Sequence, residues 1–129
     1  MYSFEKLDAW KASKKLVLIV YKILNNFPSF EKYSLCDQIR RSIVSVPSNI
    51  AEGSGRTSIK EKIHFIEIAY GSLMEAYCQL ILAFELGYIT SKHINEIKPT
   101  LDITAKLLSG LRTSYKQNTI HSQSPTIKH

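Results

Sequence analysis

The sequence is poor in cysteine: Cys36 and Cys78 are the only two, and they fall on different predicted helices. A disulfide between them is possible in principle, but a reducing cytosol disfavours one. We expect both side chains to be small, buried apolar groups, because free cysteine is among the most buried residue types.

Long apolar runs are missing as well. Lys, Glu, Ser or Gly interrupts every apolar segment well before the roughly 18–20 residues that a membrane-spanning helix needs. The start of the chain, MYSFEKLDAWKASKK, lacks the basic segment, apolar run and small-residue cleavage site that make up a signal peptide. These absences predict a cytoplasmic protein with no membrane partner.

Residue patterns that carry catalysis or hold metals are also scarce. A di-iron helical bundle needs two Glu-x-x-His motifs and a Glu from each of two further helices, whereas Glu61 and His64 form the only such motif. The other histidines, His93, His121 and His129, do not combine with the cysteines into a zinc-binding pattern. No Gly-x-Ser-x-Gly elbow or catalytic-cysteine signature is present. We therefore expect no enzyme, no metal site and no cofactor.

Basic residues, in contrast, are in excess, and mostly in the first half of the chain. The 129 residues carry 17 Lys and Arg against 11 Asp and Glu, a net charge of +6. Residues 1–60 hold ten basic and five acidic residues, while residues 61–129 hold seven and six. Such asymmetry suggests an anionic partner, although a modest basic excess also serves solubility.

Hydrophobic periodicity predicts four helices, and an apolar content of 44% is enough for one folded domain. The second helix, within CDQIRRSIVSVPSNIAEGSGR, has one apolar stripe at spacings of four, three and four, formed by Ile39, Ile43, Val46 and Ile50. The expected fold is an all-α, antiparallel four-helix bundle with long helices in up-down-up-down order. It occupies residues 1–117, and the polar residues 118–129 are expected to form a flexible tail.

Pro47 lies inside the second predicted helix, where a proline costs roughly 3 kcal/mol if nothing compensates. The chain either breaks near Val46 or continues as one kinked helix. We favour the Pro-kinked helix because the apolar stripe passes the proline without changing phase. Gly53 or Gly55 is then expected to end this helix in the left-handed conformation. The alternative is a phosphate held at the start of the next helix, beside Arg56.

The third predicted helix is apolar on more than one side. One seam has alternating spacings of four and three and comprises Ile59, Ile63, Ile66, Tyr70, Leu73, Tyr77, Leu80, Phe84 and Gly87. A second line lies off this seam and comprises Phe65, Ile68, Leu82 and Leu86. No Lys or Arg occurs between Phe65 and Ser91. Because a helix that is apolar on two sides is buried on two sides, we expect the second line to be the interface of a homo-oligomer.

Polar residues of the second and third predicted helices need partners if they are buried. We expect a structural polar network across these helices, made of Arg41, Asn49, Glu52, Ser72 and Glu75. Glu52 and Glu75 are interpreted as partners for arginine rather than as a catalytic carboxylate pair. Gly71 costs about 1 kcal/mol relative to Ala in a helix interior, and the close approach of a neighbouring helix would explain it.

Several runs of the sequence resemble a known family. They are Tyr33-Ser34-Leu35, Gln38-Ile39-Arg40-Arg41 and Ser45-Val46-Pro47-Ser48-Asn49-Ile50-Ala51-Glu52-Gly53, followed by Phe65, Ala69-Tyr70-Gly71-Ser72-Leu73 and Glu75. The family is that of the four helix bundle proteins first noticed in intervening sequences of bacterial 23S rRNA genes, with the accessory variability proteins of diversity-generating retroelements as relatives. The resemblance covers residues 4–115 and implies a ring-like homopentamer. In the retroelement relatives it implies a basic surface that binds nucleic acid and a partner reverse transcriptase.

Charge and resemblance together predict a non-enzymatic accessory protein that binds RNA or DNA through phosphate contacts. The candidate nucleic-acid-binding residues are Lys11, Lys14, Lys15, Lys22, Arg40, Arg41, Arg56, Lys60 and Lys62. No reader of specific bases is expected, because the aromatic residues fall on helical stripes where core packing explains them. The alternative is a symmetric protein–protein interaction scaffold with no direct role in nucleic-acid binding.

Overall fold

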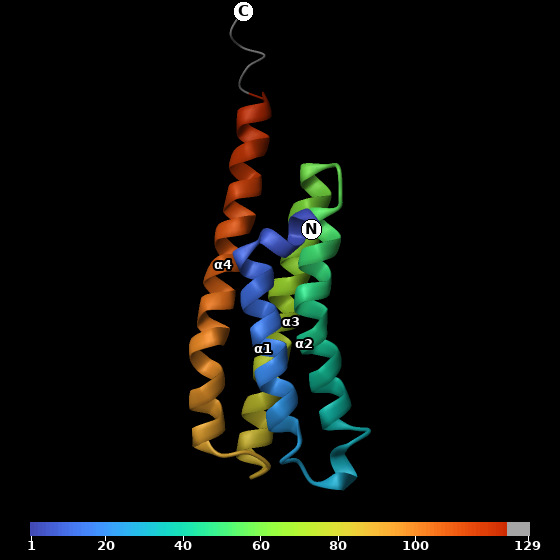
Figure 1. Cartoon of the computed structure of the whole chain (residues 1–129), viewed down its shortest axis with the longest axis vertical. Helices are drawn as coiled ribbons and strands as arrows, with labels where there is room; N and C mark the ends of the chain where they lie inside the picture. The colour runs from blue at the N-terminus through green and yellow to red at the C-terminus, as the bar shows by residue number, and fades with distance from the viewer. Residues whose placement is uncertain (124–129) are drawn as a thin grey trace, which may run out of the picture.

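Four long helices form the protein, and a computed structural model describes residues 1–123, with side chains for residues 1–118. The helices are α1 (Asp8–Leu24), α2 (Leu35–Ser54), α3 (Ile59–Glu85) and α4 (Ser91–Gln123), with short 3-10 turns η1 (Ser3–Lys6) and η2 (Ser29–Glu31). The α1–α2 and α3–α4 connections lie at one end and the α2–α3 connection at the other (Figure 1). This arrangement confirms the predicted up-down-up-down four-helix bundle. No helix in the described part of the chain is both long and apolar enough to cross a bilayer.

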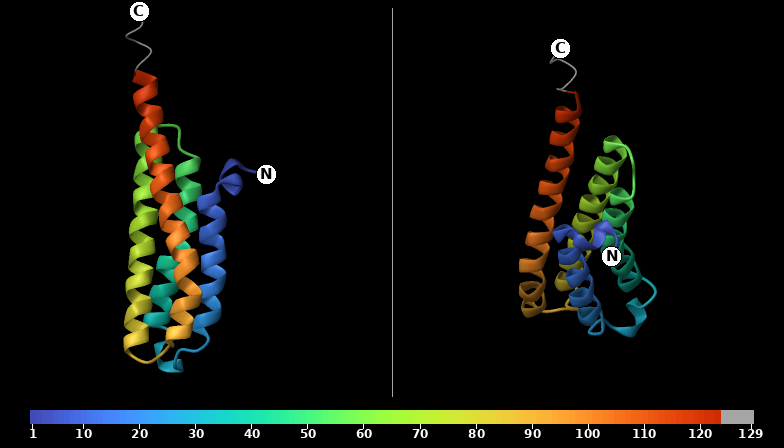
Figure 2. Two further views of the ribbon diagram at one scale, coloured as in Figure 1. Left: turned by 90° about the vertical axis from the view of Figure 1, so that its left-hand side faces the viewer. Right: turned by 45° about the horizontal axis from the view of Figure 1, so that its top comes forward.

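Each helix packs against two others, so the four helices form a square. α2 packs against α1 and α3, and α4 packs against the same two helices, whereas the diagonal pairs are not neighbours within residues 1–123. α1 and α3 therefore occupy opposite corners, and the left view of Figure 2 shows them on either side of α4. Their outward faces point in opposite directions.

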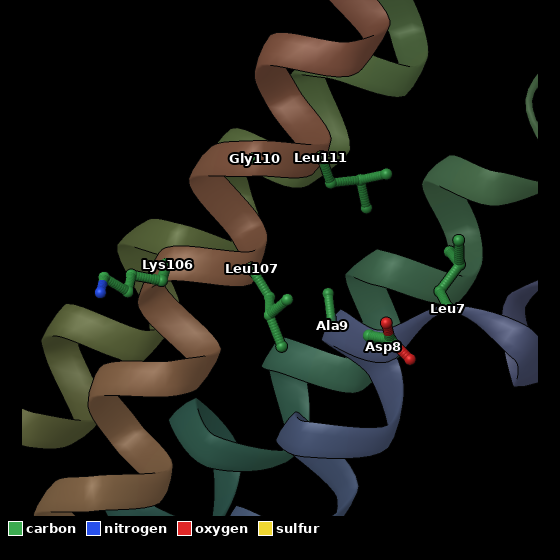
Figure 3. A pocket seen from close by; sticks show the side chains of 7 residues that line it. All are labelled: Leu7, Asp8, Ala9, Lys106, Leu107, Gly110 and Leu111. Atoms are coloured by element: carbon green, nitrogen blue, oxygen red, sulfur yellow. The ribbon is translucent and has the colours of Figure 1, made fainter.

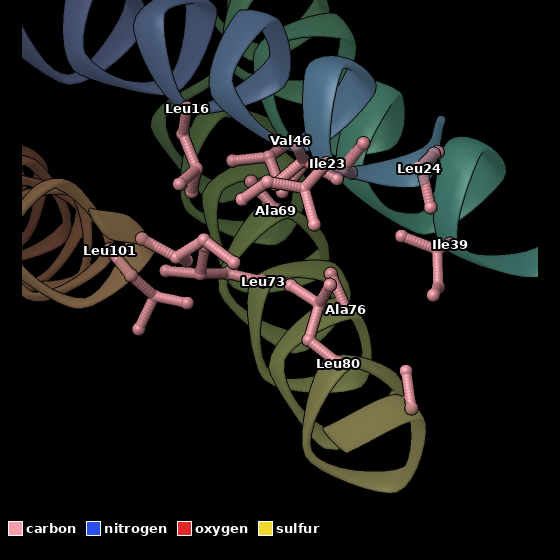
Figure 4. Packing of buried hydrophobic residues seen from close by; sticks show 14 of the residues in the cluster. Leu16, Ile23, Leu24, Ile39, Val46, Ala69, Leu73, Ala76, Leu80 and Leu101 are labelled. Atoms are coloured by element: carbon pink, nitrogen blue, oxygen red, sulfur yellow. The ribbon is translucent and has the colours of Figure 1, made fainter. Parts of the chain in front are cut away.

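The core runs along the axis of this square and receives side chains from all four helices (Figure 4). The apolar stripe predicted for α2 is buried as expected, since all four of its members are fully buried. The largest fully buried side chains are Leu16, Val20, Ile39, Ile43, Val46, Ile50, Ile66, Leu73, Leu80, Ile97 and Leu108. Each such side chain contributes about 1.5–3 kcal/mol relative to leaving it in water, so the core alone explains why these helices assemble.

The seam predicted for α3 is only partly the one that is buried. Small residues at Ala69, Ala76 and Ala83 alternate with Ile66, Leu73 and Leu80 along the buried face. The prediction was wrong for Tyr70 and Phe84, which are each 39% exposed. The reason is packing distance, because alanine lets a neighbouring helix approach closely, whereas a large ring at the same place would hold it away.

Both helical prolines lie inside continuous helices. α2 runs without interruption from Leu35 to Ser54 through Pro47, and α4 passes through Pro99 in the same way. The break considered near Val46 does not occur. The continuous apolar stripe of α2 keeps the two halves of the helix on one core and offsets the lost hydrogen bond.

The glycines after Pro47 act differently from the prediction. Gly53 is buried within α2, and a Cβ atom at this position would lie only 3.0 Å from the Cβ atom of Phe65, so glycine lets α2 and α3 pack closely. Gly55 caps the helix with φ −86°, which is right-handed, so the predicted left-handed ending is wrong there. Instead Gly87, after α3, has the left-handed φ of 81°. Its N–H donates to Phe84 O and the next N–H donates to Ala83 O, both at 2.9 Å, which is the Schellman pattern.

α4 is longer than its sequence suggested. It continues to Gln123, beyond the expected end of the domain at residue 117. Its last turns reach beyond the α2–α3 connection (Figures 1 and 2). Residues 118–123, assigned in advance to the flexible tail 118–129, therefore belong to this helix, and residues 124–129 lie outside the described part.

Candidate nucleic-acid and subunit interfaces

The outward face of α1 carries four exposed lysines, which we name the α1 lysine stripe: Lys11, Lys14, Lys15 and Lys22. The last three follow Lys11 by three, four and eleven residues, which places all four on one side of the helix. Lys14 lies over the Trp10 ring, 5.0 Å from its centroid, and none of the four forms an ion pair within the described residues. Asp8 lies one turn before Lys11, and no further Asp or Glu occurs before Glu31.

The other predicted nucleic-acid-binding residues lie apart from this stripe. Arg40 and Arg41 are near the start of α2, at the opposite end of that helix from the α2–α3 connection. The guanidinium of Arg41 forms an ion pair with Asp37 at 3.0 Å, and Arg40 Nη2 donates to the carbonyl oxygen of Lys32 at 2.8 Å. These two arginines lie on α2 and therefore do not share a helix face with the α1 lysine stripe.

The basic residues of the α2–α3 connection are largely engaged. Arg56 forms ion pairs with Glu52 at 3.2 Å and with Glu61 at 3.5 Å, and its guanidinium lies 4.8 Å from the Phe65 ring centroid. Lys62 Nζ donates to the carbonyl oxygen of Ser54 at 3.0 Å, while Lys60 is exposed. The first turn of α3 is capped by its own chain, because the Glu61 N–H donates to Ser58 Oγ. This region therefore presents less free positive charge than its composition suggests.

The exposed surface of α3 is rich in large apolar residues, although the exposed Glu67, Glu75 and Glu85 interrupt it. The large exposed residues of this helix and its C-cap lie on both flanks of the buried stripe and are each between 37% and 58% exposed; together we name them the α3 outer face: Ile68, Tyr70, Met74, Ile81, Leu82, Phe84 and Leu86. It includes three of the four predicted interface residues, while Phe65 is only partly exposed. Gly71 also lies here, and no part of the described chain comes within 4 Å of a Cβ built on it. The neighbouring helix expected at Gly71 is therefore not supplied by this protomer.

The two cysteines differ in a way that the sequence did not show. Cys36 is buried as predicted, and burial raises the pKa of its thiol. Cys78 is exposed on the outward side of α3, so the prediction that both are buried is wrong. A buried thiol behaves as a small apolar group, whereas Cys78 extends the apolar surface of the α3 outer face.

Hydroxyl and amide groups form a polar seam between α2 and α3. Ser45 and Ser72 are hydrogen bonded at 2.9 Å, and Asn49 Nδ2 donates to the Ser45 hydroxyl at 2.8 Å. Ser42 donates to Gln79 Oε1 at 2.8 Å. Ser42, Ser45 and Gln79 were missed in the predicted network, although their spacing relative to Asn49 and Ser72 places them on the same faces. These bonds satisfy polar groups that would otherwise be unpaired where the helices pack closely.

The charged members of the predicted network are not paired with one another. Arg41 and Glu75 line the same open pocket of about 380 Å³, yet Arg41 binds Asp37. Glu75 instead accepts a 3.4 Å hydrogen bond from a glutamine of the seam, and Glu52 binds Arg56. Short-range partners one helical turn away replaced the pairs expected across the helices, since residues four apart are neighbours on any helix.

Two aromatic rings project from the connection between α1 and α2. Phe30 is 73% exposed and Tyr33 is 85% exposed, and we name them the turn aromatics. Lys32 Nζ lies 5.3 Å from the Tyr33 ring centroid. Sequence reasoning placed the aromatic residues on helical stripes and omitted Lys32, and for these rings it was wrong. The useful indication was their position between two helical patterns, where no core face is available.

At the same end of the bundle, a hydrogen bond links the α3–α4 connection to the α1–α2 connection. Tyr88, in the α3–α4 connection, donates its hydroxyl to Glu31 Oε2 at 2.8 Å, and its ring packs 5.6 Å from that of Phe27. This bond lowers the pKa of the Glu31 carboxyl and raises the pKa of the Tyr88 phenol. Glu31 Oε1 also accepts from the Leu35 N–H, so this carboxylate caps the first residue of α2.

A small pocket of about 230 Å³ lies where α1 begins beside α4 (Figure 3). Leu7, Ala9, Leu107 and Leu111 give it an apolar wall, and Asp8 and Lys106 stand at its edge. This lining offers no nucleophile with an adjacent base. Within the described residues no group of three or more His, Cys, Asp or Glu is placed to hold a metal ion.

Comparison with known proteins gives one family and one fold. Residues 5–110 match the 23S rRNA-intervening sequence protein family. The structure is similar to the crystal structure of a protein of unknown function from the S23 ribosomal protein family of Bacteroides thetaiotaomicron, with a TM-score of 0.74 and 23% sequence identity over 81% of this chain and 97% of that chain. At this identity the likeness shows the fold alone. No curated protein matches the sequence.

Proposed function

The chain belongs to the 23S rRNA-intervening sequence protein family, and we propose that it is a non-enzymatic, homo-oligomeric accessory protein that binds RNA or DNA through its basic surface without base specificity. The observation that carries this proposal is the α1 lysine stripe, which is exposed and forms no ion pair within the described residues. Phosphate contacts from lysine need no particular base, because they depend on charge alone.

The length of the stripe suits a nucleic-acid backbone. From Lys11 to Lys22 the helix rises about 16 Å at 1.5 Å per residue, so the stripe can face several phosphates of one strand. The stripe also lies on the corner of the bundle opposite α3. Docking between copies through α3 therefore leaves every stripe open to solvent, and an oligomer presents it once per subunit.

The α3 outer face supports the homo-oligomer. An apolar surface of this extent on a soluble chain marks a contact with another molecule. We propose that Phe65, Ile68, Leu82 and Leu86 lie in the contact between copies, and that the subunit number is five, as the family resemblance implies. Gly71 then permits close approach of the neighbouring copy.

A second candidate function is a symmetric scaffold that binds another protein, such as a reverse transcriptase, without touching nucleic acid. The same exposed apolar residues favour it, because they serve a foreign protein as well as a second copy. Recovery of a protein partner that nuclease treatment does not release, together with no nucleic-acid binding by the purified chain, would favour this scaffold.

Binding of fluorescently labelled RNA and DNA, followed by anisotropy over a range of salt concentrations, tests the first proposal. Affinity is expected to fall linearly on a log–log plot against salt. The double variant Lys11→Gln/Lys15→Gln should bind more weakly and lower the salt slope by about one per lysine. Its matched control, Lys106→Gln/Lys116→Gln, removes the same charge from exposed positions on α4. Equal losses in the two variants, or no binding at low salt, would contradict the assignment.

A further inference from the structure

The turn aromatics occupy a place where the fold does not need them. Phe27 and Tyr88 already close the core at this end, with ring centroids 5.6 Å apart. Phe30 touches this pair only through Tyr88, at 6.1 Å and an interplanar angle of 80°. Tyr33 has no aromatic neighbour within the described residues, and it is the more exposed of the two rings. Rings that large are ordinarily buried or placed at an interface.

The charges around these rings are positive and available. Lys32 stands over the Tyr33 ring, and Lys22 is exposed at the end of α1. Arg40 uses one nitrogen to bind the Lys32 carbonyl oxygen, which leaves its other donors open. The nearby carboxylates are engaged elsewhere, because Glu31 accepts from Tyr88 and Leu35. Asp37 is likewise occupied by Arg41.

A hollow with polar edges lies directly beside the turn. It measures about 270 Å³ and runs between α1, η2 and the start of α2. Tyr21, Asn25, Ser29, Lys32 and Arg40 contribute to its lining. These side chains offer hydrogen-bond donors and acceptors together with two cationic groups, next to the exposed rings.

We propose that this end of the bundle is a stacking site for unpaired nucleobases of single-stranded RNA or DNA. Bases stack on the rings of Tyr33 and Phe30, and the adjoining phosphates pair with Lys32 and Arg40. Flat exposed rings combined with cations are the usual means of holding a single strand, because every base has a π face and every linkage a charge. This inference rests on the proposed nucleic-acid binding and adds a preference for unpaired strands.

The test compares one labelled oligonucleotide as a single strand and as a duplex at low salt. Tyr33→Ala should weaken single-strand binding about tenfold, because one stacked base is lost, and leave duplex binding unchanged. Tyr33→Phe should retain the affinity of the unaltered chain, since the ring is kept. The matched control is Tyr2→Ala, which removes an exposed tyrosine, 78% exposed, from the chain start. Both tyrosines are exposed, so neither alanine variant should alter the thermal unfolding midpoint.

A photochemical readout gives an independent answer. An oligonucleotide containing 5-iodouracil crosslinks on irradiation to an aromatic side chain on which the base stacks. Peptide mapping should place the crosslink at Tyr33 or Phe30. Crosslinking only elsewhere would overturn the stacking site.

The outcomes separate this inference from the proposal beneath it. If the unaltered chain binds neither single strands nor duplexes, the proposed function fails. If it binds both and Tyr33→Ala changes nothing, the stacking site is wrong and the proposed function stands. If Tyr33→Ala and Phe30→Ala abolish capture of a protein partner while single-strand binding is unchanged, the rings serve that protein, and the inference is also overturned.

Discussion

The outward faces of α1 and α3 lie on opposite corners of one bundle and have opposite chemistry. The α1 face carries four lysines beside the exposed Leu18 and Tyr21. The α3 outer face carries seven large apolar side chains and no Lys or Arg after Phe65, although Glu67, Glu75 and Glu85 are also exposed on that helix. Both helices bury an ordinary apolar stripe on their inward sides. We propose that the difference reflects what each helix contacts outside the protomer, which is an anionic partner on the α1 side and another copy on the α3 side.

The largest expected effect separates the buried side of α3 from the outward face of α1. Leu73→Ala should lower the free energy of unfolding by about 2–5 kcal/mol, because Leu73 is fully buried and its removal leaves a cavity. The exposed Leu18→Ala should stay within about 0.5 kcal/mol. Urea unfolding at one fixed protein concentration measures both. Comparable losses would mean that exposure does not distinguish the core from the outward faces.

Much of this architecture could be predicted from the sequence. The stripe of Ile39, Ile43, Val46 and Ile50 is unambiguous because all four members are large and apolar, and it is buried as predicted. On α3 the hydrophobic pattern gave a wrong prediction, because large residues such as Tyr70 and Phe84 dominate such a pattern. The residues that are buried at the neighbouring positions are alanines. The distance between two packed helices depends on the side chains of both. The pattern of one helix therefore does not reveal which of its small residues face a close neighbour.

The second prediction compares the outer faces directly. Leu82→Glu/Leu86→Glu should raise the dissociation constant of the assembly at least about a hundredfold, because carboxylates would be buried without partners in the contact between copies. Leu18→Glu, the matched change on α1, should leave assembly intact. Sedimentation velocity over a concentration series measures this. Unchanged assembly in the α3 variant would move the subunit contact to another face.

The third prediction concerns the close packing of α2 against α3 at Gly53. Gly53→Ala should destabilise the fold by about 1–3 kcal/mol, because the new methyl group would crowd the Cβ atom of Phe65 at 3.0 Å. Gly110→Ala meets nothing within 4 Å and should stabilise the helix by up to about 1 kcal/mol. Thermal unfolding of the two variants decides the point, and a neutral Gly53→Ala would show that α2 and α3 can separate without loss.

The smallest expected effect on stability concerns the hydrogen bond between Tyr88 and Glu31, which links the segments that follow α3 and α1. The Tyr88 hydroxyl lowers the pKa of Glu31, so this bond stabilises the fold above the carboxyl's ordinary pKa and its contribution disappears as pH falls through the lowered value. Tyr88→Phe should therefore be less stable than the unaltered chain at neutral pH, and the difference should shrink towards pH 3. Urea unfolding as a function of pH measures it. A difference that stayed constant with pH would assign the effect to packing alone.

The candidate site could be predicted less completely than the fold. Exposure of the α1 lysines follows from helical spacing, and three of the four predicted interface residues are exposed on α3. Phe30, Lys32 and Tyr33 could not be found in this way, because a turn has no period that separates inside from outside. The ion pairs of Arg41 and Arg56 were missed for a related reason, since partners within one helical turn compete with those across helices.

The molar mass of the purified chain in solution, measured by multi-angle light scattering, tests the division between the two faces most directly. The account predicts an assembly held by the α3 outer face, which for five copies of the 14.7 kDa chain has a mass of about 73 kDa. A stable species of 14.7 kDa at micromolar concentration would contradict it. The apolar side of α3 would then lie in water, without the role that distinguishes it from α1.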